Sequence, residues 1–424
     1  MDRSDIGGRH RRAVGWLALL GMCLVLLGCG QPVVAGDYNT AGQGSAASAP
    51  ATPMGSTAPT APTVPADLAR VQAAHLITPT IGWALTDQQL RWTTDAGSTW
   101  TTITPPNVRA DRLLGVSFLD TVHGWAVATG APNATQQAGL VMLRSADGGK
   151  TWQESTLAAP SGSYAVIPSG QAAIDFLDAQ HGWVVVTLAS SSNFSRGELF
   201  QTVDGGATWK KGAIPIGSPV HFVTATDGWT AGGAGGNHLY VTHDGGQSWT
   251  TPSLALPETF AGGQPTYAVP TFVDQQTGVL PVTLAANDTR ASAILFYVTQ
   301  DGGHSWATAL TLTDAGRYGV GVRAQAQVVN ASTWLAVPPG GQRLVVTRDG
   351  GRSIQARTPA NVPDSVAGVT FASEASGWIW GTRSQCAAPP PLGSTPPAKA
   401  VCRTTPVELS GTTDGGQSWV PLAP

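Results

Sequence analysis

Short apolar runs separated by polar, glycine-rich turns make up most of the chain after residue 70. Runs such as Leu140–Leu143, Leu239–Val241, Ile294–Val298 and Leu344–Val346 have the length and the β-branched or aromatic content typical of strands. Each of them leads into an Asp-Gly pair, which favours a tight hairpin because glycine adopts positive φ without a steric penalty. The pattern therefore predicts many short antiparallel strands and little helix.

One eight-residue phrase, here called the box, recurs seven times after these runs. Its pattern is [Ser/Thr]-x-Asp-x-Gly-x-[Ser/Thr]-Trp, and the only break is Ile354 in the sixth copy. We expect each Asp carboxylate to accept hydrogen bonds from backbone N–H groups just downstream, which makes each box a self-capped structural turn. The box aspartates are Asp95, Asp147, Asp204, Asp244, Asp301, Asp349 and Asp414.

A second element, here called the slot, precedes every box. It is a Gly-Trp pair in most repeats, and the looser copies are Gly278-Val279 and Thr333-Trp334. Of the 15 Trp residues, six close a box and six occupy a slot. The box aspartates are 40 to 65 residues apart, a period that suits one four-stranded blade per repeat. Since a single repeat cannot bury its apolar face alone, we expect these Trp side chains to pack neighbouring blades together, with each box Trp on the strand that leaves the turn.

The first 69 residues are predicted to be a targeting segment and a tether. An Arg-rich start and the apolar stretch 13–27 are typical of a signal peptide, and Leu26-Leu-Gly-Cys29 resembles a bacterial lipobox. We therefore expect residues 1–28 to be a lipoprotein signal peptide and Cys29 to be lipidated, with the protein at the extracytoplasmic face of a bacterial cell membrane. A transmembrane anchor is the alternative, but the apolar run is shorter than the roughly 18 residues that a span requires. Residues 29–69 are rich in Ala, Pro, Thr and Ser and are expected to be a disordered linker.

The box resembles the Asp-box, or bacterial neuraminidase repeat, of sialidase-type β-propellers. Together with the slot and the lipobox-like start, it makes the chain resemble the photosystem II stability and assembly factor family. The resemblance covers roughly residues 70–424 and implies an all-β, seven-bladed β-propeller of four-stranded antiparallel blades. It also implies that the box joins the third and fourth strands of a blade and that the slot lies on the second.

By the same resemblance, insertions between slot and box lie at the end of the propeller opposite the boxes. The longest insertion, in the last repeat, contains Cys386 and Cys402. Loops on a rigid scaffold often bind partners, although these insertions could equally be tolerated surface loops. Their basic residues form the candidate binding face: Arg196, Arg290, Arg383, Lys399 and Arg403.

The composition of the chain argues against several classes of ligand. Charged residues make up only 12% of the chain and the net charge is −3, which does not favour nucleic-acid binding. Cys386 and Cys402 are the only cysteines left once the signal peptide and Cys29 are set aside, so an oxidising compartment favours a disulfide between them. They have no neighbouring Cys or His, so no metal site is predicted, and no cofactor is expected.

Catalysis is not predicted. A sialidase site needs an arginine cluster, a Tyr nucleophile with a Glu, and an acidic Asp. The family's Phe/Tyr-Arg-Ile-Pro phrase is missing, and the nearest string, Ala165-Val-Ile-Pro168, lacks the arginine. We therefore expect no catalytic residue and a non-catalytic, membrane-tethered scaffold that binds a protein partner. The alternative is a carbohydrate-binding or glycoside-hydrolase-like propeller, which leaves a glycan partner open.

Overall fold

The computed structural model describes most of the chain from residue 70 onward. The described residues are 70–132, 138–157, 168–188, 195–233, 235–286, 291–313, 319, 321–338, 343–386, 402–404 and 408–424. The predicted signal peptide, the lipidated Cys29 and the predicted linker lie outside them, as do Arg290 and Lys399.

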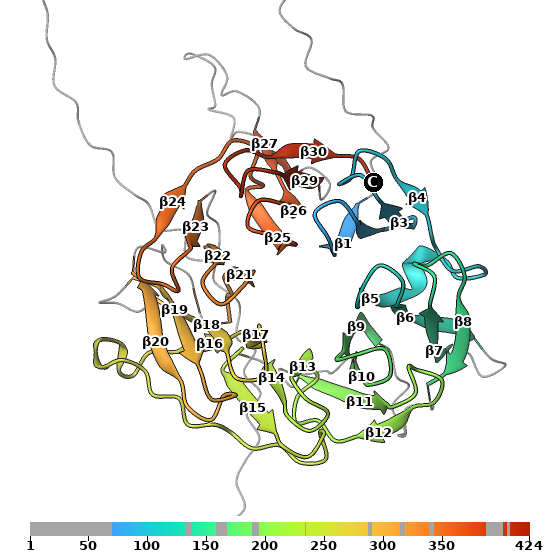
Figure 1. Ribbon diagram of the computed structural model, residues 1–424, viewed down its shortest axis with the longest axis horizontal. Coiled ribbons are helices and arrows are strands. Elements are labelled where there is room, and N and C mark those ends of the chain that lie inside the picture. The colour runs from blue at the N-terminus through green and yellow to red at the C-terminus, as the bar shows by residue number, and fades with distance from the viewer. Residues whose placement is uncertain are drawn as a thin grey trace, which may run out of the picture. The chain divides into compact units, whose positions relative to one another are not determined.

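Short strands form seven antiparallel sheets arranged as a ring (Figure 1). Blade 1 contains β1 (Val71–Leu76), β2 (Gly82–Thr86), β3 (Leu90–Thr93) and β4 (Thr101–Thr102). Blade 2 contains β5 (Leu113–Phe118), β6 (Gly124–Pro132), β7 (Ala138–Ser145) and β8 (Gln153–Thr156). Blade 3 contains β9 (Pro168–Phe176), β10 (Gly182–Leu188), β11 (Arg196–Thr202) and β12 (Lys210–Gly212). Blade 4 contains β13 (Val220–Phe222), β14 (Gly228–Gly232) and β15 (His238–Thr242).

The remaining three blades follow in the same way. Blade 5 contains β16 (Pro265–Tyr267), β17 (Thr271–Phe272), β18 (Gly278–Leu284), β19 (Ala293–Thr299) and β20 (Ala307–Leu312). Blade 6 contains β21 (Gln325–Val328), β22 (Trp334–Val337), β23 (Leu344–Thr347) and β24 (Gln355–Arg357). Blade 7 contains β25 (Ser365–Phe371), β26 (Gly377–Thr382), β29 (Glu408–Thr412) and β30 (Val420–Leu422), and a separate hairpin pairs β27 (Ser384–Cys386) with β28 (Cys402–Thr404). Two short 3-10 helices, η1 (Ala110–Arg112) and η2 (Glu258–Phe260), complete the described elements.

The predicted seven-bladed, all-β propeller is confirmed. Each blade is built from consecutive strands, and the first strand lies on the inner side of the ring (Figure 1). Two blades depart from four regular strands: the fourth strand of blade 4 is reduced to the bridge between Val241 and Thr250, and the first strand of blade 5 is split into β16 and β17. The fourth strands begin one residue after the box Trp, so the expectation that this Trp lies within the returning strand was wrong by one position.

The apolar core is divided among the interfaces between blades. Seven buried clusters occur, and each joins two adjacent blades. Between blades 2 and 3, Trp125 stacks on Phe176 at 3.5 Å between ring centroids, and Trp209 meets Phe176 edge-on. Between blades 3 and 4, Trp183 stacks on Phe222 at 3.7 Å. The slot and box Trp residues therefore join the blades, as the repeat pattern predicted.

Blade 6 differs from the others in the register of its slot. In blades 1 to 5 and in blade 7 the slot Gly pairs with the first residue of the box, as Gly82 does with Thr93. In blade 6 it is Trp334 that pairs with the first box residue, Thr347. Trp334 therefore stands at the Gly position, and the interpretation of Thr333-Trp334 as a slot was wrong by one residue. Because neighbouring residues of a strand point to opposite faces, the Trp334 side chain faces blade 5 and Leu335 faces blade 7.

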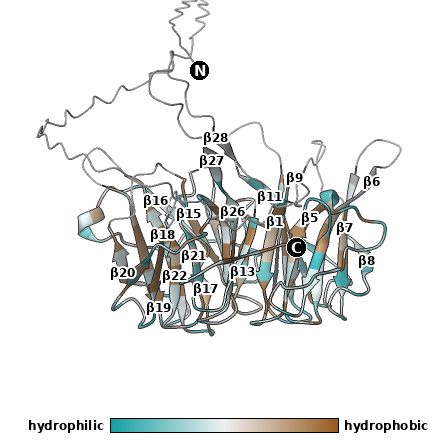
Figure 2. Cartoon of the chain, turned by 90° about the horizontal axis from the view of Figure 1, so that it is seen from above, coloured by the Kyte–Doolittle hydropathy of each residue, from teal (hydrophilic) through white to brown (hydrophobic). Residues whose placement is uncertain are grey.

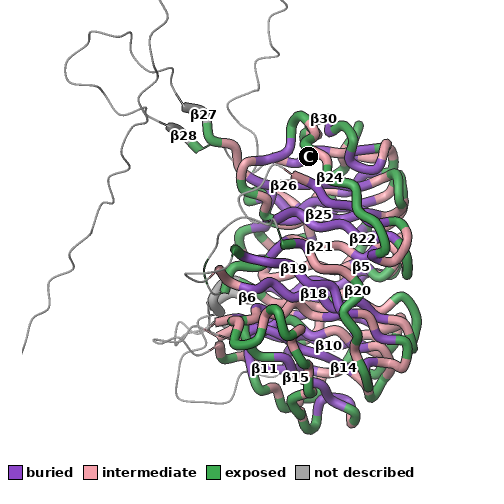
Figure 3. Tube along the Cα trace, turned by 90° about the vertical axis from the view of Figure 1, so that its left-hand side faces the viewer, coloured by how far each residue is buried: buried purple, intermediate pink, exposed green. Residues whose placement is uncertain are grey.

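The two ends of the ring carry different connections. Since the strands of a blade are antiparallel, the turns between its first and second strands lie at the same end as the boxes, and we call this end the box face. The second and third strands are joined at the other end, which we call the loop face. The base of hairpin β27–β28 lies on the loop face, where the chain leaves β26 (Figures 2 and 3). No helix among the described residues is long and apolar enough to cross a membrane.

Candidate functional site

The box turns share one set of side-chain hydrogen bonds. In the third box, the Thr202 hydroxyl donates to Asp204 Oδ1 at 2.8 Å and accepts from the Gly206 N–H at 2.9 Å. Thr208 donates its N–H to Asp204 Oδ1 at 2.9 Å and its hydroxyl to Oδ2 at 2.6 Å. The same four bonds recur in the other six boxes. Both oxygens of every box carboxylate are therefore used by their own turn.

These hydrogen bonds keep the box carboxylates ionised. Bonds from the Thr99 hydroxyl and N–H lower the pKa of Asp95 to about 2, and the corresponding bonds have the same effect on the pKa of Asp147, Asp204 and Asp349. Burial alone would raise the pKa of Asp414, but its hydrogen bonds outweigh that effect and bring it to about 2. A carboxylate of this kind is a poor proton donor near neutral pH, because it is almost never protonated there.

A second recurring cap lies four residues before each slot Gly position, in the turn between the first two strands. Asp120 is an example: its Oδ1 accepts hydrogen bonds from the N–H groups of Val122 and His123, both at 2.7 Å. The sequence interpretation missed this cap, although its fixed spacing from the slot is visible in the sequence. The seven capping residues are Thr78, Asp120, Asp178, Thr224, Asp274, Asn330 and Ser373.

The box and this turn are joined by a backbone bond in each blade. The N–H of the fourth box residue donates to the carbonyl of the residue two before the slot Gly position, as Gly205 does to Gln180 at 2.9 Å. In blade 6 the same bond runs from Gly350 to Ser332, which again places Trp334 at the Gly position. The box face is therefore built from pairs of interlocked turns.

Of the five basic residues predicted for the loop face, Arg290 and Lys399 lie outside the described residues, and the other three come from different parts of the fold. Arg196 is exposed at the start of β11 in blade 3, whereas Arg383 and Arg403 belong to blade 7. Arg383 is engaged within blade 7: its Nε donates to Glu408 Oε2 at 3.1 Å, and its guanidinium also donates to the Asn361 carbonyl. Arg383 therefore fixes the base of hairpin β27–β28.

A second contact holds Ser384, the first residue of β27. The Ser384 N–H donates to Asp364 Oδ2 at 2.7 Å. Further along, Cys386 pairs with Cys402 directly across the two strands. Residues opposite each other in an antiparallel pair have Cα atoms about 4.5–5.5 Å apart, within the range that a disulfide needs. The Cys386–Cys402 disulfide stays a prediction, with a backbone register that suits it.

The described residues hold no group of three or more His, Cys, Asp or Glu side chains close enough to bind a metal ion. Three of the described pockets lie between neighbouring blades on the box face.

No protein-family model matches the chain, and no curated protein matches it. Solved structures that resemble it include YCF48 from Cyanidioschyzon merolae, at 18% identity and a TM-score of 0.49, over 74% of this chain and 94% of that one. A GH74 xyloglucanase from Xanthomonas campestris matches at 14% identity and a TM-score of 0.35, over 83% of this chain and 67% of that one. A polysaccharide lyase of family PL25, an ulvan lyase, matches at 10% identity and a TM-score of 0.42, over 84% of this chain and 96% of that one. None of these similarities identifies an activity for this chain.

Proposed function

We propose that this chain is a non-catalytic scaffold that binds a protein partner through its loop face. In this proposal the lipid on Cys29 holds the propeller at the extracytoplasmic face of a bacterial membrane. The observation that supports the proposal most is hairpin β27–β28, which lies in the insertion of blade 7 and pairs with no described strand of a blade. Arg383 and Asp364 hold its base through hydrogen bonds, so the base is already ordered before a partner binds.

The hairpin also offers a recognised way of binding protein. Among the described strands, β27 and β28 pair only with each other, so no other described strand covers their outer edges. Extended segments of a partner add to such edges by main-chain hydrogen bonding. A glycan would instead be recognised by side-chain groups in a concave site. We therefore favour a protein partner over the carbohydrate alternative.

The test removes the hairpin and keeps its base. Residues 385–403 are replaced by Asn-Gly, which closes a tight turn between the paired residues Ser384 and Thr404. A control shortens residues 189–194, a connection on the same face in blade 3. Chemical crosslinking in membranes, followed by mass spectrometry, should recover a partner with the native chain and the control but not with the hairpin variant.

Equal recovery by the hairpin variant would show that the hairpin is not the contact. Binding to a glycan array, or hydrolysis of a sialyl or xyloglucan reporter, would favour the carbohydrate alternative. Circular dichroism should show the same strand content in all three chains, because the hairpin contributes no strand to a blade.

A further inference from the structure

The interface between blades 5 and 6 lacks the two indoles that the repeat places there. The slot residue of blade 5 is Val279, and the box of blade 6 ends in Ile354, whose side chain is 45% exposed. At other interfaces the box Trp reaches the preceding blade: the Trp152 indole donates to the Ile103 carbonyl at 2.9 Å, and Trp306 packs against Trp229 with centroids 5.6 Å apart.

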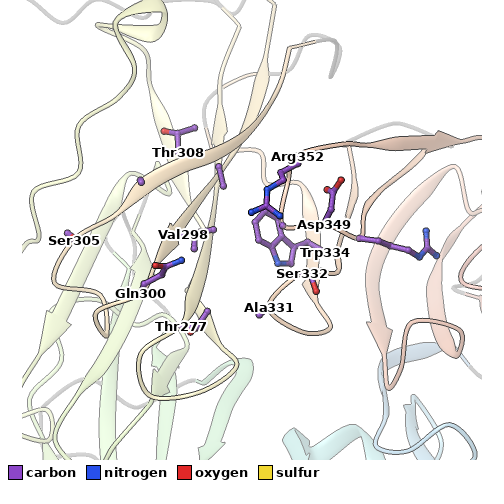
Figure 4. A pocket seen from close by; sticks show the side chains of 14 residues that line it. Thr277, Val298, Gln300, Ser305, Thr308, Ala331, Ser332, Trp334, Asp349 and Arg352 are labelled. Carbon is purple, nitrogen blue, oxygen red and sulfur yellow. The ribbon is translucent and has the colours of Figure 1, made fainter.

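Trp334 fills only part of the space that these substitutions leave. From the Gly position of β22 it packs towards blade 5, stacked on Phe296 at 5.7 Å between centroids, and it is 1% exposed. On the box-face side of Trp334 a cleft of about 800 Å³ remains. Figure 4 shows Val298, Gln300 and Thr277 on its blade 5 wall, opposite Trp334 and Arg352 on its blade 6 wall.

The same cleft exists in narrower form at two other interfaces. Between blades 1 and 2 it measures about 350 Å³, and between blades 2 and 3 about 570 Å³. Between blades 2 and 3 it is lined by the slot indole of Trp125, whose Nε1 donates to the Gly205 carbonyl of the next blade at 3.0 Å. The corresponding carbonyl of the wide cleft belongs to Gly350, and Val279 has no donor to offer it. The Gly350 carbonyl therefore lines the wide cleft without the indole donor that Gly205 receives from Trp125.

The mouth of the wide cleft carries a positive charge. Arg352 is exposed there, and no described residue forms an ion pair with it. The neighbouring carboxylate of Asp349 is used by its own turn, because it accepts the N–H and the hydroxyl of Ser353. Arg348 lies near Glu374, with 3.9 Å between Nε and Oε2. Arg352 is therefore the cation available to an arriving carboxylate.

We propose that this cleft binds an aromatic side chain of a partner protein, and that an acidic residue beside that side chain pairs with Arg352. The inference rests on the proposed function, because it assumes a protein partner. It adds a second contact on the box face, and it identifies the chemistry of the partner segment. The bond from Trp125 to Gly205 at the equivalent place between blades 2 and 3 supports an aromatic ring with an N–H donor, and Arg352 supports the acidic neighbour. The volume is within the roughly 300–1,000 Å³ typical of ligand sites.

A short peptide tests the site without knowledge of the partner. The probe is acetyl-Asp-Trp-Asp-amide, added to the full chain labelled with ¹⁵N in its indole groups. We expect saturable shifts of the Trp334 Nε1–H resonance. Gln300→Trp, which places a ring at the exposed edge of the cleft, should abolish the shifts. Its control is Ala146→Trp, the same box position in blade 2, which should leave the shifts of Trp334 unchanged.

The charge is tested separately at the exposed Arg352, where substitution should not disturb folding. Arg352→Glu should weaken binding of the acidic peptide at least tenfold and leave the weaker binding of acetyl-Asn-Trp-Asn-amide unchanged. Lys150→Glu, at the equivalent position of blade 2, is the matched control. Unchanged affinity in both the Gln300→Trp and the Arg352→Glu chains would overturn the proposal. So would shifts of Trp334 with a xyloglucan oligosaccharide and none with the peptide.

The outcome can be separated from that of the proposed function. If the peptide binds as expected and crosslinking recovers no partner, the cleft stands and the scaffold proposal fails. If a hairpin-dependent partner is recovered equally by Gln300→Trp and native chains, the scaffold proposal stands and the cleft is not its contact.

Discussion

At the residue scale, the box requires left-handed backbone at two consecutive positions. The fourth box residue has φ between 69° and 74° in six boxes, where it is glycine, and 61° at Ala96 in the first box. The fifth is glycine in all seven boxes, with φ between 81° and 98°. Ala96 therefore adopts a conformation that its Cβ makes unfavourable, by about 1 kcal/mol for an L-residue.

This conformation gives a direct prediction for Ala96→Gly. The substitution should raise the free energy of unfolding by about 0.5–1 kcal/mol, because it removes the backbone strain at this position. Glycine also makes the unfolded chain more flexible, and this effect offsets only part of the gain. Urea denaturation followed by Trp fluorescence measures it. The reciprocal control is Gly350→Ala, where an added Cβ meets nothing closer than 3.9 Å, so only the backbone strain changes. It should destabilise by a similar amount. A stabilising Gly350→Ala would contradict the argument.

The first box hydroxyl has a double role that can also be measured. Thr202 is 1% exposed, and its hydroxyl both donates to Asp204 and accepts from Gly206. Thr202→Ala should lower the free energy of unfolding by about 1–3 kcal/mol, because the Gly206 N–H loses its acceptor inside the turn. Thr202→Ser keeps the hydroxyl and should retain most of the stability. Equal losses in both chains would assign the effect to the missing methyl group instead.

The sequence predicted the hydrogen-bonding role of some of these side chains and not of others. The acceptor role of the box Asp was predicted because Asp side chains in turns commonly accept hydrogen bonds from nearby backbone N–H groups, and the structure confirms it. The role of Thr202 as a bridge could not be read from its presence at the first position, because a hydroxyl there could equally face solvent. The caps exemplified by Asp120 were missed for a different reason: Thr, Asp, Asn and Ser all serve, and no single residue type repeats.

At the element scale, register was the property that the sequence left open. Thr333-Trp334 resembles a slot, yet the ladder with Thr347 places Trp334 one position earlier. A shift by one residue moves a strand side chain to the opposite face of the sheet. The resemblance of Thr333-Trp334 to a slot therefore cannot decide which blade the Trp334 indole contacts. The cap at Asn330, four residues before Trp334, would have fixed the register had it been recognised. The cleft between blades 5 and 6 was not predicted, because it depends on this shift.

Hairpin β27–β28 gives a prediction for the two cysteines. Peptide mapping under non-reducing conditions should find Cys386 joined to Cys402, since the two are paired across the strands. The disulfide should stabilise the hairpin against local opening by roughly 3 kcal/mol in the chain-entropy model. Hydrogen exchange of β27 and β28 should therefore accelerate in a Cys386→Ser, Cys402→Ser chain. The melting temperature of the ring should change little, because the hairpin adds no strand to a blade. A native chain with two free thiols would contradict the prediction.

At the scale of the whole molecule, the described blades close the ring mainly by packing and not by a shared strand. Blade 1 and blade 7 exchange no strand, and their contact is the cluster around Trp378, whose indole lies 5.5 Å from that of Trp100. The repeat count predicted the ring, but it could not show how the ends meet, because that depends on which residues face across the last interface. One polar contact there joins His75 Nδ1 to the Thr370 hydroxyl at 3.1 Å.

His75 makes this closure sensitive to acid. Burial lowers the pKa of His75 below its ordinary value of 6.5, so the folded ring holds the neutral imidazole. The unfolded chain binds the proton more readily, and stability contributed by this group is complete above pH 6.5 and decreases as the pH falls below it. The melting temperature should therefore fall between pH 7 and pH 5. In His75→Asn, which keeps a hydrogen-bonding side chain, this part of the pH dependence should disappear.

A second histidine acts in the opposite direction and serves as the internal control. Burial would lower the pKa of His221, but the Asp175 carboxylate of blade 3, with its Oδ1 3.2 Å from His221 Nδ1, outweighs burial and raises it. Stability from this pair is complete below pH 6.5 and is lost as the pH rises through the raised pKa. In His221→Asn the melting temperature should lose that decline on the alkaline side and keep the acid-sensitive part. If His75→Asn and His221→Asn changed the same limb of the profile, neither histidine could have the role assigned to it, because the two pKa shifts have opposite signs.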